Sequence, residues 1–481
     1  MVSRMQGQQK YQQKPLVKIN IEKLIPQTHL LRKIEKVLDL SFVRDLTKEY
    51  YCQNNGRPSI DPELFFRMIL IGYIFNIDSD RKLCEEVRYN LAYRWYCKLN
   101  IDDFTPNHSS ISRIRDRYGS EVFELFFDKI VGLCKQSDMV KGKRIITDGT
   151  LIAADASLDS MKVRNVDKKK ENEEDITLKS TTKKLSNKTH ISKTDSDSSL
   201  TKKEGVPRGL KYKAHISIDA DSRVILDNKI TTGSCQETTI YLERIKYIRD
   251  KYNLNIEEAV ADRGYGSFLN ISELKEQNIT SYLPLWSSMS GKAYKLEEQG
   301  FAYNKENNYY ECPAKQRLSP VKCGSHTMYY IKMSNCKGCS FQKSCSAKKR
   351  AGKQWNVVYR SLQQNFFEEQ LKRMKLPEFQ DALKERMWTI EGINAEIKNK
   401  HGLKRARYRG ITKMQIQANM AASVLNIKRL IAWFQAIYNI IFLPTIIYVY
   451  CQTLLENRTK YLYNYYNMHS NFLRQISIVN H

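Results

Sequence analysis

The chain has 481 residues, enough for two or three domains with hydrophobic cores. Hydrophobic residues make up 41% of it, so most of the chain should fold, and the composition excludes a protein that is disordered throughout. The formal net charge is +27 and the sequence pI is about 9.5. Such an excess indicates a polyanionic partner, most commonly a nucleic acid; a solvated basic surface and a membrane surface are the alternatives.

The two ends of the chain differ in character. Residues 1–18 are polar, so we expect a tail that carries no secretory signal. Without secretion, the eleven cysteines indicate metal binding rather than disulfides. Residues 436–455 are apolar and about long enough to cross a bilayer. Because Pro444 and polar residues interrupt them, we predict a buried helix ending near Pro444 and no stable membrane association.

Residues 19–140 have the pattern of a helical domain. Asp61-Pro62 is typical of a helix start, with an acid at the N-cap and proline in the first turn. Apolar spacing predicts a second helix over 79–98. A third helix over 109–118 follows a turn, which is compatible with helix-turn-helix DNA docking and also with an ordinary surface helix. The cations that it should expose are Arg113, Arg115 and Arg117.

Two acids then occur on predicted strands. Asp148 interrupts an apolar strand and has apolar neighbours on both sides. Asp155 is the alternative, but an odd separation of seven residues puts it on the other face of a continuing strand. A second short strand, 258–261, ends in Asp262, where open α/β sheets place ligands. A turn or capping role is the alternative for both acids.

The segment between these strands combines a loop, a hairpin and a helix. Residues 162–206 are rich in lysine, serine, threonine and aspartate, so we expect a disordered basic loop. Alternating apolar residues over 212–226 predict a hairpin. A helix should follow over 237–252.

The sequence from Arg386 to Lys398 is typical of a helix with an acid in its middle. Glu391 and Lys398 are seven residues apart, about two helical turns, so they share a face. Glu396 is the rival acid, and it faces away from Glu391. Further basic residues follow and would bind phosphate groups: Lys404, Arg405 and Arg407.

A cysteine cluster precedes this helix. Cys336 and Cys339 are two residues apart, so their thiolates can bind one tetrahedral zinc ion. Cys312 and Cys345 can complete a structural site, and Cys323 could replace Cys312. The segment is polar, so we expect Zn²⁺ to supply folding energy that a core cannot. Unligated cysteines are the alternative.

Taken in order, these segments resemble a bacterial insertion-sequence transposase of the DDE superfamily, over nearly the whole chain. The blocks that carry the resemblance are Asn55-Gly-Arg-Pro-Ser-Ile-Asp-Pro62, Asp148-Gly-Thr150, Ala261-Asp-Arg-Gly-Tyr-Gly266 and Glu391-Gly-Ile-Asn-Ala-Glu-Ile-Lys398. The cysteine cluster fits the subgroup with a helical N-terminal domain and a zinc-ribbon-like insertion. The resemblance implies an α/β, ribonuclease-H-like catalytic domain, an all-helical N-terminal domain and a small zinc-ribbon-like insertion.

The implied domains follow the segments already described. They are a tail (1–18), a helical DNA-binding domain (19–140), a catalytic domain (141–430) that contains the loop (162–206) and the cysteine-rich insertion (300–350), and a helical extension (431–481).

The resemblance also implies the chemistry. Asp148, Asp262 and Glu391 would bind two Mg²⁺ or Mn²⁺ ions, which prefer oxygen ligands and promote in-line displacement at phosphorus. Water would free a 3′-hydroxyl at the transposon end, and that hydroxyl would attack target DNA, while Lys398 steadies a phosphate. The implied partners are double-stranded DNA (transposon ends and target) and a second copy of the chain, forming a homodimer on DNA. We expect a cytoplasmic, nucleoid-associated protein.

One position departs from the family pattern. Related elements often carry Tyr-x2-Arg-x3-Glu-x6-Lys, whereas Lys384 and Met387 occupy the Tyr and Arg positions here. Arg386 is one residue early, about 100° away on a helix. Either Arg386 still reaches the DNA from that angle, or end processing differs. A catalytically inactive, transposase-derived DNA-binding regulator is the alternative function, and the presence of all three acids argues against it.

Overall fold

A computed structural model describes most of the chain. The described residues are 20–52, 59–164, 185–203, 205–286, 296, 300–323, 326–342, 344–349, 354–361 and 363–438. They fall into two compact units. One takes in the described residues up to Gln27 and from Leu40 to Asn426, and the other takes in Thr28–Asp39 and those from Ile427 onward. The second unit contains α2 (Leu30–Val37), which His29 caps by accepting the backbone N–H of Leu31 at 3.2 Å.

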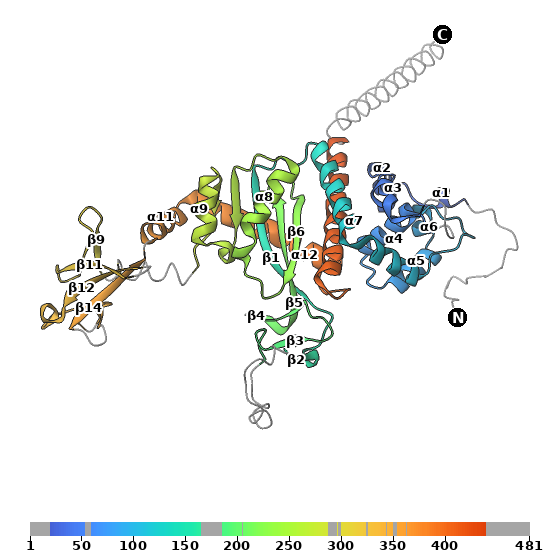
Figure 1. Cartoon of the computed structure of the whole chain (residues 1–481). Coiled ribbons are helices and arrows are strands. Elements are labelled where there is room, and N and C mark those ends of the chain that lie inside the picture. The colour runs from blue at the N-terminus through green and yellow to red at the C-terminus, as the bar shows by residue number, and fades with distance from the viewer. Residues whose placement is uncertain are drawn as a thin grey trace, which may run out of the picture. The chain divides into compact units, whose positions relative to one another are not determined.

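The N-terminal part of the first unit is helical, as predicted (Figure 1). Its helices are α1 (Ile21–Leu24), α3 (Val43–Thr47), α4 (Pro62–Ile74), α5 (Asp80–Tyr89), α6 (Leu91–Tyr96) and α7 (His108–Gln136), with a 3-10 turn η1 (Lys48–Tyr50). Asp61 caps α4 as expected, because its carboxylate accepts the backbone N–H of Glu63 at 2.8 Å. The single helix predicted over 79–98 is wrong. Asn90 is extended, and its side chain caps a separate helix, α6.

The Arg-rich helix predicted over 109–118 is the first part of α7, which continues past a kink at Gly119. Arg113 and Arg117 are exposed on it. Arg115 is not exposed as predicted, because its guanidinium pairs with the Asp80 carboxylate at 2.7 Å and lies 4.6 Å from the ring centre of Tyr408. Arg115 therefore holds the helical region together and is unavailable to a partner.

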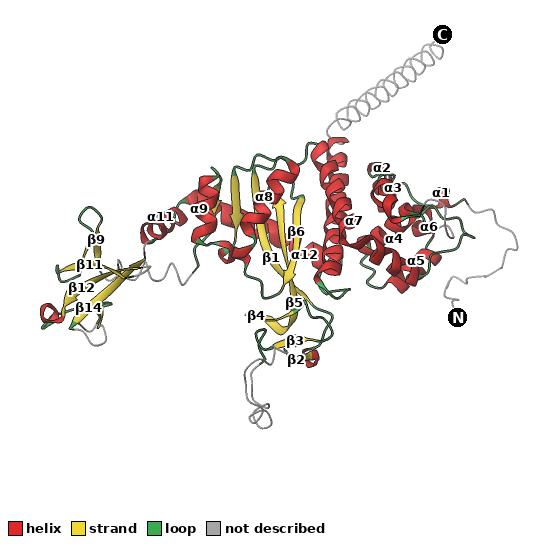
Figure 2. Cartoon of the chain, viewed as in Figure 1, coloured by secondary structure: helices red, strands yellow, loops and turns green. Residues whose placement is uncertain are grey.

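A mixed sheet forms the centre of the first unit (Figure 2). Its order is β4-β5-β1-β7-β8, with β6 paired to β5. The strands are β1 (Arg144–Ala153), β4 (Ser199–Lys203), β5 (Val206–Asp219), β6 (Ile225–Thr232), β7 (Glu258–Ala261) and β8 (Thr280–Tyr282). β5 and β6 form the predicted hairpin, while β7 and β8 run parallel to β1. This α/β arrangement fits the expected ribonuclease-H-like fold.

Helices pack against this sheet. They are α8 (Tyr241–Tyr252), α9 (Phe268–Glu276), α11 (Gln364–Met374) and α12 (Pro377–Lys400), and 3-10 turns η3 (Glu237–Thr239) and η4 (Arg263–Tyr265) precede α8 and α9. α12 lies against β1 and β7. It has the helical conformation predicted for the segment around Glu391, and it buries Ile390, Ile393 and Ile397.

The region predicted as a disordered loop, 162–206, contains regular structure at both ends. β2 (Met161–Val163) pairs with β3 (His190–Ser192), β4 pairs with β5, and a 3-10 turn η2 (Leu158–Ser160) precedes them. Hydrogen bonds rather than apolar burial order the segment: the Asn187 side chain, for example, bonds both backbone groups of Leu200 at 2.7 and 2.8 Å. A search for apolar periodicity could not detect this order. Residues 165–184 lie outside the described part.

A second, antiparallel sheet has the order β13-β14-β12-β11-β10-β9. Its strands are β9 (Ala302–Asn304), β10 (Tyr309–Glu311), β11 (Arg317–Cys323), β12 (His326–Lys332), β13 (Lys348–Lys349) and β14 (Trp355–Ser361), with a 3-10 turn η5 (Met333–Cys336). The expectation that this insertion has no core is wrong. Its buried cluster comprises Phe301, Tyr310, Leu318, Tyr329, Ile331 and Val358.

Residues 411–438 are helical. Most of the apolar segment 436–455, including the predicted helix end near Pro444, lies outside the described residues. None of the helices in the described ranges is both long and apolar enough to cross a membrane.

Gly266 offers a test of the loop that follows β7. A Cβ at this position would lie 1.9 Å from the carbonyl oxygen of Pro284, so backbone must move to accept it. We expect Gly266→Ala to destabilise the protein by about 1–3 kcal/mol in thermal or urea unfolding. Gly132→Ala is the control, because that α7 glycine has open space around it and alanine favours helices. Equal stability of the two variants would contradict the crowded loop.

Candidate active site

Two predicted acids lie side by side where the pairing of β1 with β7 ends. The parallel register of β1 and β7 runs from Arg144 opposite Glu258 to Thr147 opposite Ala261. Asp148 is the next residue of β1, which continues to Ala153, and Asp262 directly follows β7. The strand pairing therefore brings together carboxylates that are 114 residues apart in the sequence.

A single guanidinium nitrogen lies between these carboxylates. Nη2 of Arg386, on α12, is 2.6 Å from Oδ1 of Asp148 and 4.0 Å from Oδ2 of Asp262. The side chains of Arg386 and Asp148 are only 15% and 16% exposed, whereas that of Asp262 is 38% exposed. Arg386 therefore acts as a largely buried counter-ion to the two acids in this structure.

The electrostatics follow from this arrangement. Burial raises the pKa of Asp148; the Arg386 charge lowers it, and the neighbouring Asp262 raises it. The pKa of Asp262 is also raised by burial, lowered by Arg386, and raised by Glu237. Two close carboxylates that both have raised pKa values form a site that favours a bound cation.

Asn394 ties Asp148 to α12 from the other side. Its Nδ2 donates to Oδ2 of Asp148 at 2.8 Å, so both oxygens of that carboxylate are held. Oδ1 of Asn394 and Nε of Arg386 are buried and lack a hydrogen-bond partner. Unsatisfied polar atoms on both sides of Asp148 indicate a site that is completed by a ligand.

The structure does not add the third predicted acid to the pair. Glu391 is exposed on α12, one turn before Asn394. Within the described residues, no three histidine, cysteine, aspartate or glutamate side chains come together as metal ligands.

The sequence predicts only a helix start at Glu237 and does not identify it as part of the site. Glu237 belongs to η3, and Oε1 accepts from Nζ of Lys213 at 2.5 Å. Its carboxyl group lies beside Gly149 and Gly264, each next to a candidate acid. The sequence holds no signal for this, since the contact depends on how the η3 turn folds over the ends of the strands.

Deeper in the same cluster, His215 hydrogen-bonds Oη of Tyr265 at 3.1 Å and Oγ1 of Thr231 at 3.0 Å. Burial lowers the pKa of His215 to about 4, so it is neutral at physiological pH. His215 is therefore a structural support for the η4 turn rather than a charged group of the site.

The remaining DNA-binding candidates have different environments. Arg405 is exposed and pairs with Asp155 at 3.3 Å. Arg407 lies with its guanidinium 4.5 Å from the ring centre of Tyr73, so it contributes to packing. Arg117 lies over the ring of Tyr51 at 5.8 Å and remains exposed.

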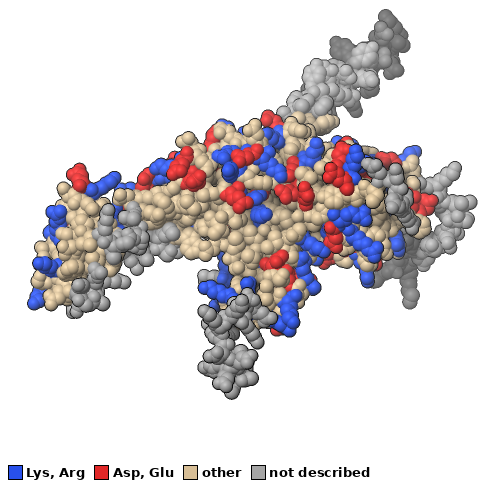
Figure 3. Space-filling model, viewed as in Figure 1, with Lys and Arg blue, Asp and Glu red and all other residues tan. Residues whose placement is uncertain are grey.

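A groove of about 900 Å³ opens beside Asp148. Gly149 and Asn394, neighbours of that carboxylate, are among its lining residues. Its cations are Lys203, Arg208, Lys211, Lys398, Lys404 and Arg405, and no carboxylate lines it within the described chain. On the face seen in Figure 3, basic side chains gather where β4 and β5 project from the sheet.

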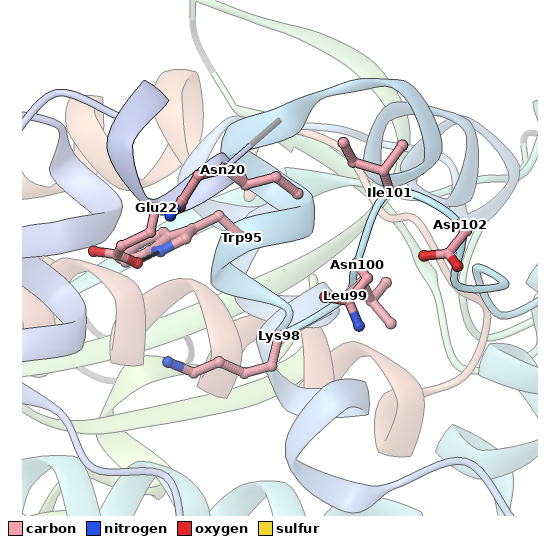
Figure 4. A pocket seen from close by; sticks show the side chains of 9 residues that line it. Asn20, Glu22, Trp95, Lys98, Leu99, Asn100, Ile101 and Asp102 are labelled. Atoms are coloured by element: carbon pink, nitrogen blue, oxygen red, sulfur yellow. Dashed lines mark hydrogen bonds between the residues drawn. The ribbon is translucent and has the colours of Figure 1, made fainter. Parts of the chain in front are cut away.

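A second pocket, of about 660 Å³, lies in the helical region (Figure 4). The indole N–H of Trp95 donates to Glu22 there, and Nζ of Lys98 lies 5.7 Å from the Trp95 ring centre. Its charges are of both signs and include Asp102. The pocket has neither the paired acids nor the excess of cations found near Asp148.

The four cysteines of the predicted zinc site lie near one another. Burial raises the pKa of the Cys345 thiol, and the nearby thiols of Cys336, Cys312 and Cys339 raise it further. Cys312 and Cys336 also pack against the apolar cluster of the second sheet. The thiols do not form a recognisable metal site among the described residues. The side chain of Cys323 is outside the described part.

Two models of known protein families match parts of this sequence. Residues 19–117 match the family model described as "Transposase domain (DUF772)", and residues 311–431 match "Transposase DDE domain". Asp148 and Asp262 lie outside both matched ranges, whereas Glu391 lies within the second. No curated protein matches the sequence.

Two solved structures are similar at low identity. A piggyBac transposase synaptic complex with hairpin DNA is 8% identical, over 83% of this chain and 72% of that one, with a TM-score of 0.32. A Mos1 transposase paired-end complex is 11% identical, over 50% of this chain and 64% of that one, with a TM-score of 0.17.

The family assignment therefore depends on the two transposase models, which match in the order that the sequence blocks predicted. These two matches support an insertion-sequence DDE transposase.

Proposed function

We propose that this transposase cleaves DNA strands at the ends of an insertion sequence and joins them to target DNA. Asp148, Asp262 and Glu391 would be its metal-binding acids. The observation that carries the proposal is the pair of carboxylates on adjacent strands that share one guanidinium nitrogen. Its position beside a groove lined by cations suits a phosphodiester substrate.

The residues present fit a divalent metal. Nη2 of Arg386 stands in for a cation, since it contacts carboxylate oxygens from both strands. Oxygen-only ligands suit Mg²⁺ or Mn²⁺. Such an ion, when bound, would activate the attacking oxygen and stabilise the leaving oxygen of an in-line displacement. We infer that Glu391 supplies the third carboxylate.

The chain's own residues have separable roles. Asn394 orients Asp148 by holding one of its oxygens. Arg386 keeps the two acids from repelling each other in the free protein and must move for a metal to bind. Burial lowers the pKa of Lys398, and the nearby Asp148 carboxylate opposes this shift; Lys398 would hold a phosphate next to the acids.

The proposed partners are double-stranded DNA, both transposon ends and target, and a second copy of the chain for synapsis. We place the protein in the cytoplasm, associated with the nucleoid. A DNA-binding regulator without catalysis is a second candidate. The exposed position of Glu391 and the ion pair of Arg386 favour that reading, and the experiment below separates the two.

The first test removes the acids one at a time. We expect Asp148→Asn, Asp262→Asn and Glu391→Gln each to reduce Mg²⁺-dependent cleavage of transposon-end DNA by about 10³-fold or more, because each loses a metal ligand. DNA binding without metal should persist. Glu396→Gln on the same helix is the control and should cleave normally. A wild-type protein that binds but never cleaves would favour the regulator; full cleavage by Glu391→Gln would exclude Glu391.

The second test concerns the counter-ion. Arg386→Gln frees both carboxylates, so we expect Mn²⁺ to bind about tenfold more tightly, or about 1.4 kcal/mol, as measured by electron paramagnetic resonance of free Mn²⁺. Lys384→Gln is the matched control, because Lys384 is exposed on α12 and pairs only with nearby Asp381 at 3.0 Å in the described structure. Unchanged Mn²⁺ affinity in Arg386→Gln would show that Arg386 does not compete for the site.

The third test concerns zinc, which we propose is held by Cys312, Cys336, Cys339 and Cys345. We expect about one Zn²⁺ per chain by elemental analysis, and none in a Cys336→Ser/Cys339→Ser double variant. Cys235→Ser, outside the cluster, should keep its zinc. Because the second sheet has its own core, the double variant should remain partly folded there. A folded, zinc-free wild-type protein would refute the site.

A further inference from the structure

The groove beside Asp148 contains lysines whose positive charges have no carboxylate partner in the described structure. Lys203 comes from β4, Lys211 from β5 and Lys398 from α12, and all three line the groove. No carboxylate forms an ion pair with any of them in the described structure. Like charges that three separate elements bring to one place repel each other, so the fold alone does not account for them.

Lys211 shows this most clearly. Only 8% of it is exposed, and it lies in the middle of the sheet, opposite Ala153 on β1 and Ser199 on β4. Lys213, two residues along the same strand face, is paired with Glu237. One buried lysine of β5 therefore has a carboxylate partner and the other has none.

The pKa values agree with the geometry. Burial lowers the pKa of Lys211. Burial also lowers the pKa of Lys398; Asp148 raises it, and the charges of Lys211 and Lys203 lower it. Both shifts come first from burial, and at Lys398 the nearby Asp148 carboxylate only partly offsets it. A bound polyanion would reverse these effects.

The rest of the lining identifies the part of the polyanion that binds. The other walls are largely aliphatic, from Leu151, Val206 and Leu210, and no aromatic side chain lines the groove in the described chain. Bases therefore have nothing to stack on, and recognition must be of phosphates. A groove of about 900 Å³ has room for a short stretch of the backbone of one strand.

We propose that this groove binds the sugar-phosphate backbone of a single DNA strand, independently of sequence, and leads it to Asp148. Asn394 connects the two sites, since it lines the groove and donates to Asp148. The proposal rests on the proposed function for its choice of DNA. It adds Lys203, Lys211 and Arg208 to the contacts and specifies a single strand next to the acids.

The test measures binding of a short fluorescein-labelled single strand in EDTA, by anisotropy across a salt series. Lys203→Gln/Lys398→Gln should bind several-fold more weakly, and the slope of log affinity against log salt should fall by about 1.4, or about 0.7 per lysine. The matched control is Lys202→Gln/Lys400→Gln, which changes an exposed lysine beside each position, outside the groove. Its slope should equal that of the wild type. Equal slopes for the two double variants would overturn the proposal.

Two further arms sharpen the result. Lys211→Met keeps the buried stem and removes the charge, so it should reduce the slope by about 0.7 without loss of thermal stability. Strands of different sequence should bind equally, and a slope change seen only with a blunt duplex would overturn the single-strand assignment. Mg²⁺-dependent cleavage is measured separately. If the protein cleaves DNA but the salt slopes of the variants equal that of the wild type, only the groove proposal is refuted. If the slopes change but no DNA is cleaved, only the proposed chemistry is refuted.

Discussion

Two buried strands force two carboxylates together, and much of the surrounding structure responds to their repulsion. The β1–β7 pairing extends to Thr147 and Ala261, so the backbones of the next residues, Asp148 and Asp262, start side by side. Adjacent carboxylates that are partly removed from water are unfavourable without a cation. Arg386 supplies that charge in the free protein, and Asn394 fixes the remaining oxygen of Asp148. α12 is thus positioned by polar contacts with the acids as well as by its buried isoleucines.

The sequence could identify the two aspartates as candidates because each interrupts or follows an apolar strand. An acid is unexpected at such a position unless it has a function. The sequence could not show the register of the two aspartates, which depends on how β7 pairs with β1. The sequence also could not show where Arg386 lies. Helical spacing puts this residue about 100° from the family's position, and only the fold shows which direction faces the acids. Asn90 was missed for a simpler reason, since apolar spacing continues across it while its side chain caps a new helix.

The cysteine-rich insertion has a hydrophobic core of its own, contrary to the prediction. Its cysteines do lie near one another, but the claim that the segment lacks a core fails, because Tyr310, Leu318 and Tyr329 are buried in it. These three strand residues are isolated in the sequence and become one cluster only when the sheet forms. A bound zinc would then fix the end of an existing sheet instead of nucleating the fold, so its loss should be local in effect.

The negative charges of the acids and the positive charges of the lysine groove act on each other. Asp148 attracts Lys398 in the free protein, while Lys203 and Lys211 repel it. A cation bound by the acids would cancel that attraction and leave Lys398 surrounded by positive charge, so a phosphate would bind more favourably. The converse holds by linkage, since a phosphate that neutralises the lysines lowers the free energy of a cation next to it. Metal and DNA should therefore bind with positive cooperativity.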